Sequence, residues 1–401
     1  MKLATLSVLV SALSIVPAQI PSNDLCSNAF QLFVPHVISG STVGAGFEAG
    51  GGACAPIGAD VWFKFVAPFT GTAIVTTCSI FGGTANFDTV IVIREHFMCG
   101  VSSWVGCNDD SCFSLQSSCT APITIGLTYD IQIGGYQGAV GNYTLSLSAT
   151  PAVPTNDSCA TAIPIFTNSY ASAENFGATT GPDPTPNCST VFKDVWYAFV
   201  APSNGNYTAN TCYAPNLTLS SVVSVWQGAC GALTQVGCNS NGCPGVLGGS
   251  SATWCATAGT TYYVSVGGIG TSGGTFSLLI NPSTNPPMEL AFFNVGAGTL
   301  GFTVKNGPLG GSELTVITVN QGAYPVAWFA GISPSLQEIV DEWNTGYPFV
   351  APLSPVCGGV VVGPFNNLPP GLTVYAVSLG FAPGATGFPS KFSNPASATI
   401  P

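Results

Sequence analysis

Asp60-Val-Trp-Phe-Lys-Phe-Val-Ala-Pro68 returns later in the chain as Asp194-Val-Trp-Tyr-Ala-Phe-Val-Ala-Pro202. In the first copy Val61, Phe63 and Phe65 lie on one side, and the residues between them lie on the other. Successive side chains of a β-strand point to opposite faces, so this period of two predicts a strand with one wetter face. Because the strand occurs twice, the sequence predicts a duplicated β domain.

The repeat extends well beyond this strand. Asn23-Asp-Leu-Cys26 returns as Asn156-Asp-Ser-Cys159, and Val105-Gly-Cys-Asn108 returns as Val236-Gly-Cys-Asn239. All seven cysteines of the first copy have a counterpart in the second. We therefore predict two domains, repeat 1 (22–150) and repeat 2 (154–282), and a third region at 288–401.

Other alternating runs in repeat 1 lie at 72–77, 88–94, 122–125, 128–133 and 142–148, separated by turns rich in Gly or Asn. About eight short strands in a domain of this size are typical of a two-sheet antiparallel β-sandwich or jelly roll. We predict an all-β protein.

The composition narrows the function. Only 6% of residues are charged, and 17 acidic against 6 basic residues give a net charge of −11. Nucleic acid is an unsuitable partner for such a chain, because phosphate binding needs clustered Lys and Arg. The acidic balance is compatible with bound calcium, and it is equally typical of soluble extracellular proteins.

The N-terminal residues predict secretion. A lysine, an apolar stretch and Val16-Pro-Ala18 together predict a signal peptide over residues 1–18. No later segment is apolar enough for a transmembrane helix. Fifteen cysteines in a secreted chain favour a disulfide framework, with at least one cysteine left over because the number is odd.

Spacing does not fix the disulfide connectivity, and we take neighbours in sequence as the first hypothesis. It joins Cys26 to Cys54 and Cys99 to Cys107, and it pairs Cys112 with either Cys119 or Cys78. Repeat 2 would follow the same pattern with its own cysteines, which are Cys159, Cys188, Cys212, Cys230, Cys238, Cys243 and Cys255.

Several motifs in fixed order resemble the bacterial pre-peptidase C-terminal domain family. They are Asn-Asp-x-Cys, Asp-Val-Trp-Phe/Tyr-x-Phe-x-Ala-Pro, Asp88-Thr-Val90, Cys107-Asn-Asp-Asp110 and a late Tyr-x-Ile/Val-x-Val/Ile-Gly-Gly. The resemblance covers both repeats. It implies a jelly-roll-like sandwich on a secreted or surface-exposed bacterial protein, similar to carbohydrate-binding modules and calcium-binding in some members.

The region 288–401 shows strand patterns at 300–304, 314–319 and 372–378, which predict a further β-sandwich. One short helix is predicted at 333–343, because Ser333 can cap it, Pro334 fits its first turn and its apolar residues recur at helical spacing.

Catalytic residues are scarce. The two histidines, His36 and His96, form no metal-binding pair, and Ser272 matches a Gly-x-Ser-x-Gly pattern in a hairpin rather than in a strand–turn–helix. The cysteines lack zinc-site spacing. We predict that the protein is not an enzyme.

Calcium is the one metal that the chemistry favours, because it needs six to eight oxygen ligands. Asn108, Asp109 and Asp110 are consecutive, and Asp88 begins the strand that leads toward their turn. The corresponding residues of repeat 2 have no carboxylate, so we predict a site in repeat 1 only. The alternative is a turn whose Asn and Asp side chains bond their own backbone.

Aromatic side chains near turns are candidates for stacking on sugar rings. Trp104 and Tyr136 fit this description, whereas Trp62 and Trp196 lie within strands and are expected in the core.

The sequence thus predicts a secreted or cell-surface, non-catalytic protein that binds carbohydrate or mediates adhesion, with calcium in repeat 1 and an extracellular polysaccharide or cell-surface polymer as partner. One alternative is a structural spacer or envelope component without a ligand. The other is an extracellular hydrolase with accessory modules, whose acids would be Glu338, Asp341 and Glu342 beside Trp343.

Overall fold

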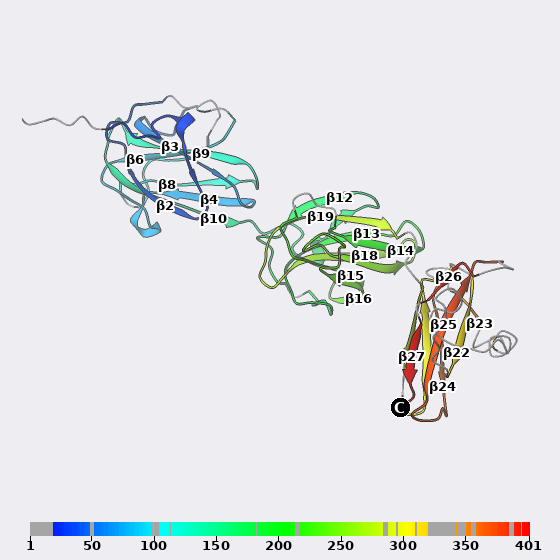
Figure 1. Cartoon of the computed structure of the whole chain (residues 1–401). Coiled ribbons are helices and arrows are strands. Elements are labelled where there is room, and N and C mark those ends of the chain that lie inside the picture. Colours follow the sequence, from blue (N-terminus) through cyan, green and yellow to red (C-terminus); the bar gives the residue numbers. More distant parts are fainter. Residues whose placement is uncertain are drawn as a thin grey trace, which may run out of the picture. The chain divides into compact units, whose positions relative to one another are not determined.

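The protein is almost entirely β-strand in the computed structural model (Figure 1). It divides into two compact units, Met1–Ala152 and Val153–Pro401. No helix in the described part of the chain is long and apolar enough to cross a membrane. The structure describes residues 19–48, 52–97, 99, 104–112, 114–181, 183–212, 217–283, 288–293, 296–308, 311–319, 342, 350–353, 358–384, 389–393 and 395–401.

Repeat 1 consists of two sheets and two short 3₁₀ turns. The first sheet contains, in spatial order, β1 (Phe30–Leu32), β3 (Ile57–Val66), β9 (Thr128–Tyr136), β6 (Thr89–Glu95) and β7 (Trp104–Asn108). The second contains β2 (His36–Ser41), β10 (Asn142–Pro151), β4 (Gly71–Thr76) and β8 (Ser118–Ile123), with β5 (Thr84–Ala85) beside β10. The 3₁₀ turns are η1 (Cys26–Asn28) and η2 (Ser79–Phe81).

Repeat 2 reproduces this arrangement. Its first sheet contains β11 (Ile163–Ile165), β13 (Val191–Val200), β18 (Thr261–Ile269), β15 (Ser221–Ala229) and β16 (Ala232–Ser240). Its second contains β12 (Tyr170–Glu174), β19 (Thr275–Pro282), β14 (Gly205–Asn210) and β17 (Ser251–Ala256), and the turn η3 (Cys159–Thr161) corresponds to η1.

The strand order identifies both repeats as jelly rolls. When the eight principal strands of repeat 1 are numbered along the chain, one sheet has the order 2-7-4-5 and the other 1-8-3-6. The predicted antiparallel β-sandwich is confirmed, and each repeat adds one parallel pair at a sheet edge, β1 with β3 and β11 with β13. Parallel pairing is possible there because the chain crosses to the other sheet after β1 before it returns as β3.

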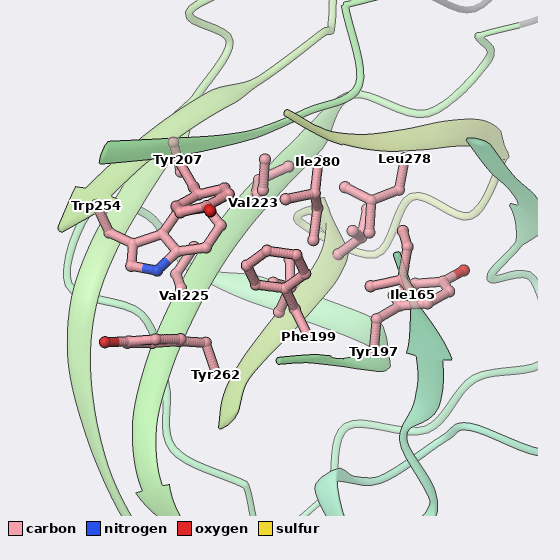
Figure 2. Packing of buried hydrophobic residues seen from close by; sticks show 14 of the residues in the cluster. Ile165, Tyr197, Phe199, Tyr207, Val223, Val225, Trp254, Tyr262, Leu278 and Ile280 are labelled. Atoms are coloured by element: carbon pink, nitrogen blue, oxygen red, sulfur yellow. The ribbon is translucent and has the colours of Figure 1, made fainter. Parts of the chain in front are cut away.

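The core of each repeat lies between its two sheets. In repeat 2, Phe199, Tyr207, Trp254 and Tyr262 form a cluster of rings whose centroids lie 5.2–6.0 Å apart. Figure 2 shows these rings packed among aliphatic side chains from both sheets, such as Val223 and Val225 on β15 and Leu278 and Ile280 on β19. Burial of such large side chains is the main source of stability in a small β domain.

The strand tryptophans Trp62 and Trp196 are fully buried, but they lie outside the core between the sheets. Trp62 occupies the outer face of β3, where Cys26, Ala29 and Cys99 cover it. Asn23 clamps this cover to the strand, because Asn23 accepts a hydrogen bond from Trp62 N and its side chain donates to Trp62 O, at 2.8 and 3.0 Å. This explains why Asn-Asp-x-Cys recurs with the tryptophan strand.

The disulfide prediction is largely wrong. The bonds are Cys26–Cys99, Cys54–Cys107 and Cys78–Cys112 in repeat 1, and Cys159–Cys230, Cys188–Cys238 and Cys212–Cys243 in repeat 2. Only the alternative that pairs Cys112 with Cys78 is confirmed. Cys119, a predicted disulfide candidate, is a buried free thiol, whereas Cys255 is disulfide-bonded but not to Cys243. The bonded cysteines lie 31 to 73 residues apart in sequence, so proximity in sequence does not select the partners.

The region 288–401 is a third sandwich. One sheet contains β20 (Glu289–Phe293), β21 (Leu300–Lys305) and β24 (Val360–Phe365), and the other contains β23 (Val350–Pro352), β22 (Ser312–Thr318), β25 (Thr373–Phe381) and β26 (Lys391–Phe392), with β27 (Ala396–Thr399) also paired to β25. This order is that of an immunoglobulin-like sandwich. Of the predicted helix 333–343, only Glu342 lies within the described residues.

Candidate functional site

Three of the four predicted calcium ligands meet at one edge of repeat 1. Asp88 directly precedes β6, and Asp109 and Asp110 directly follow β7. Because β6 and β7 are antiparallel neighbours, the start of one lies beside the end of the other. One carboxylate oxygen from each aspartate lies within 4.8 Å of the others.

The electrostatics of this acidic cluster (Asp88, Asp109 and Asp110) favour a cation. Burial raises the pKa of Asp88, and the negative charge of Asp110 adds to the effect. The pKa of Asp109 is raised by burial and by both neighbouring carboxylates. The Oδ1 atoms of Asp88 and Asp109 are buried, and neither has a hydrogen-bond donor within the described part of the chain. Like charges at this distance repel, and a divalent cation would remove both the repulsion and the unmet oxygens.

The backbone around the cluster is held by buried hydroxyl groups. The Ser117 hydroxyl donates to the carbonyl oxygens of Asp109 and Thr89, and Thr77 Oγ1 lies 3.0 Å from Thr89 Oγ1. The disulfide Cys78–Cys112 ties the same turn to the end of β4. These contacts hold the turn in one conformation, as a preorganised site requires.

Asn108 is the fourth predicted calcium ligand, and this role stays a prediction. Its Oδ1 accepts a hydrogen bond from Ser118 N at 2.8 Å. The equivalent Asn239 of repeat 2 accepts one from Ser251 N at the same distance. The shared Asn therefore joins neighbouring strands in both repeats, and the three carboxylates alone define the candidate site.

Repeat 2 keeps the scaffold and lacks the charges. Thr211 Oγ1 lies 2.8 Å from Ser221 Oγ, and the Ser250 hydroxyl donates to Ser221 O, as in repeat 1. Ser220, Ser240 and Asn241 occupy the positions of the three aspartates. Repeat 2 is thus a natural version of the same turn without its carboxylates.

The two predicted sugar-stacking residues do not share a site. Trp104 is 47% exposed and pairs with Arg94 on β6. Arg94 in turn pairs with Asp130 on β9, and Tyr136 lies six residues farther along that strand, which is roughly 20 Å at the rise of a β-strand. Tyr136 lies beside the acidic cluster instead, because its backbone N–H donates to Asp88 O at 3.0 Å. A single sugar ring cannot contact both aromatics, so each stays a separate prediction.

The sequence comparisons agree with a β-sandwich module. Residues 155–266, which begin before η3 and end within β18, match a family described as galactose-binding domain-like and associated with the type 9 secretion system. The resemblance to pre-peptidase C-terminal domains is not confirmed. No curated protein matches the sequence.

Proposed function

We propose that this chain is a secreted or cell-surface bacterial protein whose jelly-roll repeats bind carbohydrate without catalysis. The match of repeat 2 to a galactose-binding-like domain carries the proposal. Repeat 1 has the same strand order, so the argument extends to it. Six disulfides lie between described residues of the two repeats, and they are consistent with an oxidising compartment.

A glycan array probed with the mature full-length chain tests this function. We expect saturable binding to neutral glycans, with terminal galactose among them. The reduced protein, whose disulfides are broken, serves as the control for non-specific adhesion. If no glycan binds in the presence of calcium, the carbohydrate proposal is wrong and the structural spacer becomes the better reading.

We also propose that repeat 1 binds one calcium ion at Asp88, Asp109 and Asp110. Three carboxylates supply three to six oxygens, and backbone carbonyls or water can complete the shell. The support comes from the short oxygen separations and from the two buried oxygens that have no donor in the described region. The ion would join the start of β6 to the end of β7 and so stabilise repeat 1.

Calcium should raise the stability of repeat 1. A ligand that binds only the folded state adds about 2.7 kcal/mol to the free energy of unfolding when its concentration is 100 times Kd. In Asp109→Asn this gain should disappear, while the metal-free variant becomes slightly more stable than the metal-free wild type because one repulsive charge is gone. Thermal unfolding in calcium and in chelator measures both effects.

Glu289→Gln is the matched control, because it removes one negative charge from an exposed residue on β20, outside repeat 1. It should leave the calcium response unchanged. An equal calcium response in wild type and Asp109→Asn would exclude the acidic cluster as the site, and the Asp side chains would then be ordinary turn residues.

A further inference from the structure

The outer face of the first sheet in repeat 1 contains four buried polar side chains, and repeat 2 has aromatic residues at two of these positions. Asp60, Arg94, Asp130 and Gln132 are each at most 2% exposed. Arg94 is the only arginine in the chain. Its guanidinium carbon lies 5.8 Å from the centroid of the Trp62 ring. Burying the sole arginine of a protein is costly unless its donors find acceptors.

Those donors are not all paired. Arg94 Nη2 donates to Gly52 O, but Nε and Nη1 have no hydrogen-bond partner within the described part of the chain. Gln132 donates through Nε2 to Asp60 Oδ2, which leaves its Oε1 as an acceptor, also without a partner there. The cluster therefore contains unmet N–H donors on two nitrogens of Arg94 and one unmet carbonyl acceptor on Gln132.

Arg94 and Gln132 line a cavity of about 230 Å³. Its other walls are mainly apolar, from Phe47, Ala53, Pro56 and Ile57. Apolar walls with a few convergent polar groups are typical of small-molecule sites, although cavities for drug-sized ligands usually exceed about 300 Å³. This cavity is large enough for one ring rather than for a chain of them.

The surrounding charges decide the kind of ligand. Asp130 lies directly across from Arg94, and both Asp130 and Asp60 stabilise the guanidinium charge. Since the positive charge is already compensated, the cavity has no excess of positive charge to attract an anion. The unmet groups need a partner that accepts from two N–H groups and donates to a carbonyl. Neighbouring hydroxyl groups do both.

Repeat 2 shows that this sheet face can be closed without a buried arginine, and its one unmet group among the described residues is the Trp196 indole N–H. Trp226 takes the place of Arg94 in the strand register, across from Tyr263. Its indole N–H donates to Ser265 Oγ at 3.1 Å, and its ring packs 6.3 Å from that of Trp196. Covering the strand therefore does not require an arginine, and the polar set in repeat 1 points to a ligand.

We propose that the cavity lined by Arg94 and Gln132 binds one neutral sugar ring through adjacent hydroxyl groups. Arg94 donates to the hydroxyl oxygens, and Gln132 Oε1 accepts from a hydroxyl. This rests on the proposed carbohydrate function and assigns it to a particular face of repeat 1.

The first test uses the mature full chain labelled with ¹⁵N-arginine. Because Arg94 is the only arginine, its Nε–H gives a single proton–nitrogen signal. Methyl galactoside, methyl glucoside and methyl mannoside are titrated in turn, and at least one should move this signal saturably. If the array shows sugar binding but no methyl glycoside moves the signal, the cavity assignment is overturned and the carbohydrate function stands. If neither experiment detects binding, both proposals fail.

Two variants give the second test by calorimetry. Arg94→Lys keeps the charge but loses the forked donors, so affinity should fall about tenfold or more. The triple variant Arg94→Trp/Asp130→Tyr/Gln132→Ser installs the side chains with which repeat 2 closes this face, and it should fold without binding. Trp226→Phe is the control in repeat 2 and should bind like the wild type. Unchanged affinity in both repeat 1 variants, or galacturonate binding tighter than methyl galactoside, would contradict the proposal.

Discussion

Replacing Glu313 by Gln should stabilise the C-terminal sandwich at pH 8 and have little effect near pH 4.5. Glu313 lies on β22 and is fully buried. Thr315 Oγ1 donates to its Oε2, whereas Oε1 has no partner among the described residues. Burial raises the pKa of this carboxyl from 4.5 to about 8, and hydrogen bonds from Thr315 and Ser378 only partly oppose that rise.

The direction in which stability changes with pH follows from the protons that each state binds. Between pH 4.5 and 8 the unfolded chain has lost this proton and the folded chain still holds it, so stability falls as pH rises. The contribution is fully present below pH 4.5 and is lost by about pH 8. At about 1.36 kcal/mol for each pH unit, the loss approaches roughly 5 kcal/mol. Gln cannot ionise, so Glu313→Gln should avoid this loss.

Hydrogen exchange of the full chain, followed on peptides that cover β22 and β25, measures the difference at each pH. The protection of Glu313→Gln relative to wild type should grow from pH 4.5 to 8. Glu289→Gln, which changes an exposed acid on β20, should show no such growth. A constant difference between Glu313→Gln and wild type across this range would mean that Glu313 is ionised in the folded protein.

The duplicated strand made the fold predictable. The alternation in residues 61–66 is realised in β3, where Val61, Phe63 and Phe65 enter the core. The alternation could not show that Trp62 is buried as well, because its cover comes from η1 and from a disulfide to a distant loop. Strand period reports which face a residue occupies, but what covers that face depends on the tertiary structure.

The candidate sites could be predicted only where their residues are close in sequence or lie at adjacent ends of two paired strands. Asp109 and Asp110 are adjacent, and a β6–β7 hairpin brings Asp88 to them. The Arg94 cavity depends on strand order, because β9 inserts Gln132 between β3 and β6. One signal was available in the sequence: a single arginine within Val90-Ile-Val-Ile-Arg-Glu95, where an apolar strand offers no evident reason for it.

Removing the Cys26–Cys99 bond should lower the stability of repeat 1 by about 4 kcal/mol. The bond closes a loop with a sequence separation of 73. In the chain-entropy model a loop of this size restricts the unfolded chain by about that amount. The loss should be at least as large in practice, because Cys26 and Cys99 also cover Trp62 on the outer face of β3.

The variant Cys26→Ala/Cys99→Ala is compared with wild type by urea unfolding of the full chain, with hydrogen exchange on β3 to assign the transition to repeat 1. Cys119→Ala is the control, because burial raises the pKa of this free thiol to about 12 and no bond is lost with it. Its cost should be about 1 kcal/mol or less. Peptide mapping of the native protein supplies an independent check. If Cys26 is found bonded to Cys54, the Cys26–Cys99 pairing is wrong. If the double variant is as stable as Cys119→Ala, packing alone holds the cover over Trp62.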